Sequence, residues 1–258
     1  MSVAVVTGAS RGLGRALARE LAGRGWDLVL DARSAGPLEG VAEELAGSGV
    51  RVVAVPGDVT SAGHRADLVA AARELGGLDL LVNNAGVLGG EPLVPLGVHA
   101  LAGLRAALEV NVVAPLGLLQ EALPLLRASG RGAVLNVSSD AAVVAYRTWG
   151  AYGASKAALD LLSAVLAVEE PGLRVWWADP GSMRTAMLAA AEPDEDLGGV
   201  PEPEEVAPVL LRLLDGGGGG AGLPSGRYTA EGLARGGGEG GVTAGARGAG
   251  GVTVEGDL

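Results

Sequence analysis

Short apolar runs alternate with longer amphipathic segments along most of the chain. Runs rich in β-branched and other apolar residues predict strands at 3–7, 26–31, 50–55, 78–82, 133–137 and 173–177. Apolar residues at helical spacing predict helices at 15–24, 41–47, 101–127 and 152–169. Such alternation is typical of an α/β fold. The pattern therefore predicts a doubly wound parallel sheet, a Rossmann-type three-layer sandwich, in a single domain.

The composition changes after residue 216. In the C-terminal part only residues 225–229 resemble a further strand, and residues 231–258 are largely Gly, Ala and Arg. A segment so poor in large apolar side chains cannot form a core. We therefore expect one folded domain over residues 1–230 and a flexible, Gly-rich tail over residues 231–258.

Composition also limits the function classes. A chain of 258 residues has ample length for one core, and a strand that starts near the N-terminus leaves no room for a signal peptide. No uninterrupted run of eighteen or more apolar residues occurs, so we expect no membrane span. The net charge of −11 argues against nucleic-acid binding. With no cysteine and only His64 and His99 as imidazoles, we expect no metal site. We expect a cytoplasmic protein.

A glycine-rich turn joins the first predicted strand to the first predicted helix. Gly8, Gly12 and Gly14 fall in this turn. Glycines at such a junction allow a tight turn, close approach of the backbone to a pyrophosphate, and close helix–strand packing. The turn predicts a dinucleotide site because a strand precedes it and a helix follows it.

The end of the second predicted strand bears on the choice of dinucleotide. An acid there would bind the ribose 2′-hydroxyl of NAD, whereas a basic group would accommodate the 2′-phosphate of NADP. The chain has Asp31, Ala32 and Arg33 at this point, and Arg11 is available from the glycine-rich turn. Asp31 could instead point at neighbouring strands. The region therefore favours NADP without excluding NAD.

Two further strand ends carry polar side chains. Asp58 could accept a hydrogen bond from an adenine amino group, or it could cap the helix that starts near Ser61. Asn83 and Asn84 could hold the end of the fourth strand through their amides, with Gly86 allowing a cofactor to approach, or they could form a simple turn.

Tyr152 and Lys156 are the strongest candidates for chemistry. They lie four residues apart, so a helix places them on one face. A neighbouring ammonium group would bring the pKa of the phenol down towards neutrality. Ser139 follows the fifth strand and could offer its hydroxyl to a substrate oxygen. The bare pair would more often be an exposed pair on a helix, but the upstream motifs favour catalysis.

These motifs occur together in one order: Thr7-Gly8-xxx-Gly12-x-Gly14, Asn83-Asn84-Ala85-Gly86, Asn111, Ser139, Tyr152-xxx-Lys156 and Pro180-Gly181-xxx-Thr185. In this respect the chain resembles the short-chain dehydrogenase/reductase family, from about residue 3 to residue 229. The resemblance implies an NAD(P)-dependent carbonyl reductase or alcohol dehydrogenase that transfers a hydride between a nicotinamide and a carbonyl or secondary alcohol of a small substrate.

The resemblance also implies roles for residues. Tyr152 would be the acid/base, Ser139 would hold the substrate oxygen, and Lys156 would lower the tyrosine pKa and bind the nicotinamide ribose. Asn111 would hold a water in a proton relay. In the family the acid that selects NAD falls at Ala32, and an arginine at Arg33 goes with NADP. The positions implied to bind the cofactor are Gly8, Ser10, Arg11, Gly12, Leu13, Gly14, Arg33, Asp58, Val59, Asn84, Ala85, Gly86, Tyr152, Lys156, Pro180, Gly181 and Thr185.

A finer similarity points to the sepiapterin reductase and diketone reductase branch, through Trp149-xx-Tyr152, Leu166-xx-Glu169-Glu170-Pro171 and Arg174-Val175. Trp176 departs from the small polar residue that is usual in the family. The resemblance implies a homodimer or homotetramer that uses the helix after Tyr152. An NADP-binding redox sensor or scaffold and an epimerase or dehydratase on the same fold stay open as alternatives. Segments 88–100 and 186–205 would decide the substrate.

Overall fold

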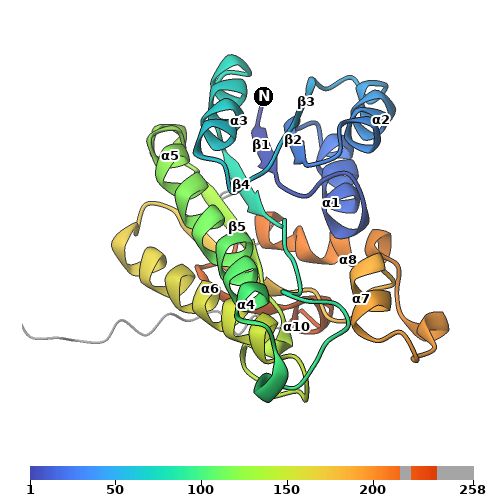
Figure 1. The fold of residues 1–258 in the computed structure, drawn as a ribbon. Helices are drawn as coiled ribbons and strands as arrows, with labels where there is room; N and C mark the ends of the chain where they lie inside the picture. The colour runs from blue at the N-terminus through green and yellow to red at the C-terminus, as the bar shows by residue number, and fades with distance from the viewer. Residues whose placement is uncertain (216–221, 237–258) are drawn as a thin grey trace, which may run out of the picture.

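The computed structural model describes residues 1–215 and 222–236. Its centre is a seven-stranded sheet in the order β3-β2-β1-β4-β5-β6-β7 (Figure 1). Every neighbouring pair is parallel. The strands are β1 (Val3–Val6), β2 (Asp27–Ala32), β3 (Val52–Pro56), β4 (Leu80–Asn83), β5 (Ala133–Val137), β6 (Arg174–Asp179) and β7 (Gly226–Thr229).

Helices cover both faces of the sheet, which confirms the predicted three-layer sandwich (Figure 1). One face carries α1 (Gly12–Gly23), α2 (Ala35–Ala46) and α8 (Pro203–Leu210). The other carries α3 (Ala62–Glu74), α5 (Ala114–Ser129) and α6 (Gly150–Glu169). The remaining helices are α4 (Leu101–Leu108), α7 (Ala186–Ala191), α9 (Arg212–Asp215) and α10 (Ala230–Ala234), with 3₁₀ turns η1 (Leu96–Val98), η3 (Asp140–Ala142) and η4 (Leu197–Gly199).

Strand β1 shows why the short apolar runs form a central sheet. Its side chains alternate between the faces, as the two-residue period of a strand requires. Val3 and Val5 belong to the cluster under α3, α5 and α6, whereas Ala4 and Val6 belong to the cluster under α1, α2 and α8. All of β1 is buried, because helices cover both sides of the sheet.

The helix expected at 101–127 is not one regular helix. It divides into α4, a π-helical turn η2 (Glu109–Val113) and α5. Pro115 stands at the start of α5 and brings no backbone N–H to the helical ladder. A π-turn widens the helix locally and is often found at functional sites. Here it contains Asn111.

The C-terminal strand continues into structure that the composition did not predict. Helix α10 crosses the boundary expected at residue 230, and its Leu233 is buried. A guanidinium N–H of Arg212 donates to the carbonyl of Leu233 at 3.1 Å. Residues 231–236 thus belong to the folded part. The tail prediction for residues 237–258 lies outside the described residues.

Truncation should separate these two parts. Deleting residues 231–258 should lower the free energy of unfolding by about 2–5 kcal/mol, the usual cost of losing a buried leucine. Deleting only residues 237–258 should leave it unchanged. Chemical denaturation of both truncated chains, with Leu233→Ala in the full chain as the matched point variant, measures the difference. Equal losses for the two truncations would contradict this division.

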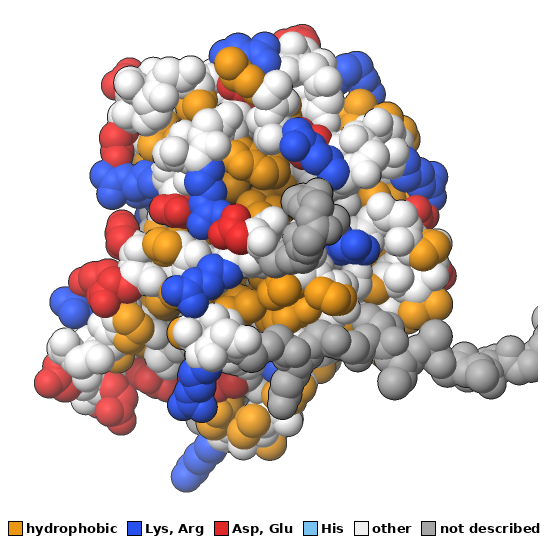
Figure 2. Space-filling model, turned by 180° about the vertical axis from the view of Figure 1, so that it is seen from behind, with side chains coloured by type: hydrophobic (Ala, Val, Ile, Leu, Met, Phe, Trp, Pro, Cys, Tyr) orange, Lys and Arg blue, Asp and Glu red, His pale blue; other side chains and the backbone are white. Residues whose placement is uncertain are grey.

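One face of the molecule carries side chains of both charges (Figure 2). On the face opposite to that of Figure 1, arginines and acidic side chains are interspersed between apolar patches (Figure 2). A nucleic-acid footprint would instead gather basic side chains on one face.

Candidate active site

The exits of the parallel strands surround a cleft of about 870 Å³. This is where open α/β sheets bind ligands, outside the carboxyl ends of the strands. The cleft brings together most of the catalytic and cofactor-binding positions that the resemblance implies, and of these positions Gly14 and Asn111 do not line it. Its lining includes Gly8, Ser10, Arg11, Gly12, Leu13, Arg33, Asp58, Val59, Asn84, Ala85, Gly86, Ser139, Tyr152, Lys156, Pro180, Gly181 and Thr185.

The glycine-rich turn is held tightly against the exit of β4. Gly8 has a φ of +66°, in the left-handed region that favours glycine. The Asn84 amide donates to the carbonyls of Thr7 and Gly8 at 2.8 and 3.2 Å. A Cβ added at Gly14 would lie 2.3 Å from the Gly8 carbonyl oxygen. The turn thus leads directly into the N-terminus of α1, whose positive end suits a pyrophosphate.

Gly14 gives a prediction of its own. Gly14→Ala would force the turn away from α1 and should cost about 1–3 kcal/mol of stability, as overpacking does. NADPH binding should weaken with it. The matched control is Gly23→Ala in the same helix, because a Cβ there meets nothing within 4 Å. Denaturation curves and NADPH titrations of both variants make the measurement. Equal stability and equal NADPH affinity of the two variants would contradict the role given to Gly14 in the turn.

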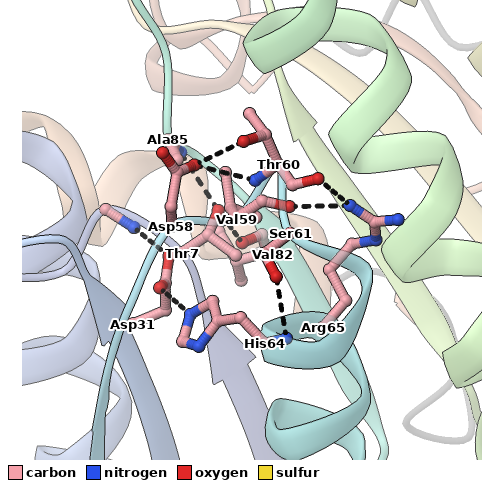
Figure 3. A network of polar contacts seen from close by, with 11 residues as sticks. Thr7, Asp31, Asp58, Val59, Thr60, Ser61, His64, Arg65, Val82 and Ala85 are labelled. Carbon is pink, nitrogen blue, oxygen red and sulfur yellow. Dashed lines mark hydrogen bonds and ion pairs between the residues drawn. The ribbon is translucent and has the colours of Figure 1, made fainter.

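The carboxylate of Asp31 is not free to bind the ribose of a cofactor. Its Oδ1 lies 2.6 Å from Nε2 of His64 on α3, and both side chains are buried (Figure 3). Gly8 N–H donates to the other oxygen at 3.4 Å. Burial raises the pKa of Asp31, and His64 opposes that shift. The Asp31 carboxylate is therefore bonded to α3 and to the glycine-rich turn, and not to a neighbouring strand, the alternative that the sequence left open.

The ribose end of the cleft is left with basic groups. The next residue, Ala32, has no carboxylate, while the exposed Arg33 and Arg11 both line the cleft. Arg33 lies near enough to Asp58 to lower the pKa of that carboxyl, after the larger influence of hydrogen bonds from Thr60. These groups form a surface suited to a phosphate monoester.

Asp58 shapes the loop after β3. Its Oδ1 accepts hydrogen bonds from the N–H and hydroxyl of Thr60 at 2.9 and 2.8 Å (Figure 3). The cap of α3 is Ser61, whose hydroxyl accepts from the His64 N–H at 3.5 Å. The interpretation of Asp58 as the helix cap is therefore wrong. Asp58 and the buried Val59 instead line the cleft.

At the other end of the cleft the exit of β5 meets the start of α6. The hydroxyl of Ser139 donates to Asp140 Oδ1 at 3.0 Å, and it lies near enough to the Tyr152 phenol to lower the pKa of that phenol. It also accepts from the Ala141 N–H at 3.1 Å. The Trp149 ring packs edge-on against Tyr152, with centroids 5.6 Å apart. The phenol is 8% exposed, so it is nearly shielded from water except through the cleft.

Lys156 lies one helical turn beyond Tyr152. Its Nζ donates to the Val137 carbonyl at 2.7 Å and lies 5.6 Å from the Tyr152 ring centroid. Burial lowers the pKa of Lys156 to about 8, against an opposing influence of Asp160. At neutral pH the lysine is therefore mostly charged.

The tyrosine pKa moves in the direction opposite to that expected from the sequence. Burial raises the pKa of Tyr152, and the nearby Ser139 hydroxyl only partly opposes that rise. Asp179 and Asp140 raise it further. The reason is that desolvation disfavours the phenolate. Tyr152 is consequently a neutral phenol, the form that can donate a proton.

Asn111 lies behind these groups. Its Oδ1 accepts from the Val87 N–H, and its Nδ2 donates to the Val87 carbonyl and to the Ser155 hydroxyl, all at 2.9 Å. A Cβ added at Gly86 would lie 3.3 Å from Asn111 Oδ1 and 3.8 Å from Lys156 Nζ. Gly86 therefore separates Asn111 from Lys156, and its lack of a side chain leaves room between them.

Sequence reasoning missed several charged groups around this end of the cleft, among them Asp140 of η3. Asp179 precedes Pro180 at the exit of β6, and the strand-exit rule that singled out Ser139 could have found it. Asp160 and Arg227 carry no local signal, because they are 67 residues apart and meet only in the folded chain. Among residues 1–215 and 222–236, no group of three or more His, Asp or Glu side chains is arranged to hold a metal ion.

Comparison with known proteins agrees with this geometry. The family model described as short chain dehydrogenase matches residues 2–196. The chain belongs to the short-chain dehydrogenase family and is an oxidoreductase, which confirms the resemblance that the motifs indicated.

Individual relatives differ in substrate. Sepiapterin reductase from Rattus norvegicus is 39% identical over 202 residues, 74% of this chain and 77% of the relative. Cis-4-hydroxycyclohexanecarboxylate dehydrogenase from Sinomonas cyclohexanicum is 36% identical over 222 residues, 82% of this chain and 88% of the relative. An alcohol dehydrogenase from Thermococcus sibiricus, solved in complex with 5-hydroxy-NADP, has a TM-score of 0.80 and 29% identity, covering 89% of this chain and 95% of that one.

Proposed function

We propose that the protein is an NADP-dependent carbonyl reductase or alcohol dehydrogenase for small organic substrates, with Tyr152 as the acid/base. The observation that carries this proposal is the neutral, nearly buried Tyr152 phenol, which shares one cleft with Ser139 and with Lys156, one helical turn further on. A phenol held in this way is ready to give a proton to a carbonyl oxygen.

The cleft suits the proposed cofactor on grounds of shape and charge. The space against Gly14 is too small for a Cβ, so the backbone of the turn can approach a pyrophosphate closely. Arg11 and Arg33 line the ribose end, and Asp31 is engaged by His64. The related Thermococcus sibiricus enzyme was solved with an NADP derivative. The same arginines do not exclude NAD as a weaker cofactor.

When bound, the reduced cofactor supplies the hydride, and the chain supplies everything else. Ser139 would hold the substrate oxygen beside the Tyr152 hydroxyl. Tyr152 would donate the proton from its Oη as the carbonyl carbon is reduced, and take it back in the oxidative direction. Lys156 would hold the nicotinamide ribose and favour the transient phenolate by its charge. Asn111 would hold a water that returns a proton towards Lys156.

A homodimer or homotetramer is part of the proposal. Large apolar side chains on the outer sides of α5 and α6 are exposed, including Leu116, Leu161, Val165 and Val168, with Leu161 68% exposed. Burying such a surface against a second copy would be favourable.

The same helices bear on membranes and localisation. By length and composition, the runs Leu101–Ser129 and Gly150–Glu169 could cross a membrane, but core helices of soluble proteins meet the same criterion. Both runs pack one side against the sheet. That the protein is cytoplasmic, with no membrane and no nucleic-acid partner, stays our prediction.

Net cofactor turnover tests the proposal and separates it from its alternatives. With a panel of small ketones and aldehydes, we expect substrate-dependent oxidation of NADPH. A redox sensor or scaffold would bind NADPH without turnover. An epimerase or dehydratase would transform substrate with no net change in the cofactor. Either outcome would overturn the proposal.

A further inference from the structure

An ion pair between a buried carboxylate and a partly buried arginine lies next to the catalytic groups. Asp160 follows Lys156 by one turn of α6 and is 9% exposed. Its Oδ1 accepts a hydrogen bond from the hydroxyl of Ser138, at the exit of β5. Its Oδ2 accepts from the guanidinium Nε of Arg227, on β7, at 3.1 Å. The exit of β5 and the strand β7 therefore both contact this carboxylate of α6.

Arg227 makes a second contact that ties it to the substrate side. Another guanidinium N–H of Arg227 donates to the backbone carbonyl of Ser139 at 2.9 Å. The Arg227 guanidinium thus links β7 to two groups. One is the backbone of Ser139, whose hydroxyl is the proposed holder of the substrate oxygen, and the other is the carboxylate of Asp160, one helical turn after Lys156. The fork geometry of arginine suits such a double contact, whereas lysine could make only one of the two well.

The charge of Asp160 bears on both Arg227 of the sheet and Lys156 of α6. Burial disfavours a charged Asp160, and the hydrogen bonds from Ser138 and Arg227 counter this. A carboxylate that stays charged at this point favours the ammonium form of Lys156, which burial otherwise disfavours. Removing the carboxylate should therefore let the lysine lose its proton at lower pH.

We infer that Asp160 and Arg227 are positioning residues for the proposed reaction: Arg227 fixes the Ser139 carbonyl and the Asp160 carboxylate, and Asp160 keeps Lys156 charged. The inference rests on the proposed function only for the roles of Ser139 and Lys156, since the contacts themselves are independent of it.

Other charged groups lie on elements that pack against α6. They are Asp140 of η3, Asp179 and Arg174 of β6, Arg105 of α4, Glu109 of η2 and Arg227 of β7. Among them, Arg227 is the group that contacts Asp160 in the ion pairs of the described residues. The variants below therefore alter one pair and leave the remaining charges in place.

The composition of the chain allows a direct measurement, because Lys156 is its sole lysine. Protein labelled with ¹³C at the lysine side chain gives one signal to follow through a pH titration by NMR, with no need for activity. We expect the wild-type signal to titrate near pH 8, from the lowered pKa of about 8. In Asp160→Asn the midpoint should fall by about one pH unit, the size expected for losing one nearby opposite charge.

A matched control exists at the opposite end of the sheet. Asp27 is fully buried, and its Oδ2 accepts a hydrogen bond from Nη2 of Arg51 at 2.6 Å. Asp27→Asn removes a buried, arginine-paired carboxylate of the same kind, so it should lower stability without moving the lysine titration. If Asp160→Asn also leaves the midpoint unmoved, the inference is wrong, whatever happens to the melting temperature.

Arg227→Lys tests the second contact. The variant keeps a positive charge for Asp160 but loses the fork that also holds the Ser139 carbonyl. This variant adds a second lysine, so the Lys156 signal is first assigned by comparison with the wild-type spectrum. We expect the Lys156 midpoint to stay within about 0.3 pH units of wild type while kcat falls about tenfold with KM for NADPH unchanged. An unchanged kcat, or a kcat loss matched by Asp27→Asn, would remove Arg227 from the proposal.

The proposed function and the inference about Asp160 and Arg227 are contradicted by different results. If Asp160→Asn shifts the lysine titration but Lys156→Ala keeps full activity, the proposed function is wrong and the electrostatic link stands. If Lys156→Ala is inactive and Asp160→Asn titrates like wild type, the proposed function stands and this inference falls.

Discussion

Replacing Tyr152 by phenylalanine should lower kcat by about 10²–10⁴, the range for loss of a general acid. The change removes one hydroxyl and keeps the ring that packs against Trp149. NADPH affinity and the free energy of unfolding should therefore hardly change. The phenol is neutral at working pH because burial raises its pKa, so the loss falls on proton donation. Steady-state kinetics on any accepted carbonyl measures it.

Tyr228 offers the matched control. It is the same residue type and it is buried. Its hydroxyl donates to the Pro224 carbonyl at 2.8 Å, and Tyr228 does not line the cleft. Tyr146 is less suitable, since it lines the cleft and donates to Asp140 at 2.7 Å. We expect Tyr228→Phe to cost some stability and little kcat. If Tyr152→Phe keeps more than about a tenth of the wild-type rate, the assignment of Tyr152 is wrong.

Removing both Arg11 and Arg33 should weaken NADPH binding by roughly 2–4 kcal/mol, the loss of charge-assisted hydrogen bonds to a phosphate. NADH binding should change far less, because NADH lacks the 2′-phosphate. The double variant Arg11→Ala, Arg33→Ala is compared with wild type by kcat/KM for each cofactor.

The control removes two arginines elsewhere. Arg127 pairs with Glu170 and Arg131 with Asp79, and neither arginine lines the cleft. The variant Arg127→Ala, Arg131→Ala changes the net charge equally and should leave both cofactors unaffected. Wild-type kcat/KM for NADH that equals or exceeds that for NADPH would contradict the NADP proposal.

The sequence predicts the sheet well because the central strands, such as β1, β4 and β5, are buried on both faces. Such strands appear as continuous apolar runs, and 133–137 coincides with β5. Helix ends are predicted less well. The start expected at residue 41 for α2 falls inside the helix, since Gly36 and Pro37 obscure the periodicity of its first turn.

Residues at strand exits were also predictable, because parallel strands end at one edge of the sheet. Ser139, Asp58 and Asn84 were found by this rule, and all line the cleft. Side-chain contacts between residues distant in sequence could not be predicted. Asp31 is turned towards His64, 33 residues away, and a one-dimensional pattern does not show that pairing.

The same limit explains α10. Five residues that include two alanines and a glycine carry little helical signal, and Leu233 alone gives no periodicity. The helix forms because the folded domain offers Leu233 a place in its core, a tertiary effect that composition cannot show.

Deuterium transfer tests the central claim most directly. NADPH carrying deuterium at the transferable C4 position is incubated with the protein and an accepted ketone, and the product alcohol is analysed by mass spectrometry. We predict one deuterium on the carbinol carbon for each NADPH oxidised, with the product nearly absent in Tyr152→Phe. An altered substrate without the label, or labelled alcohol formed equally well by Tyr152→Phe, would contradict the account.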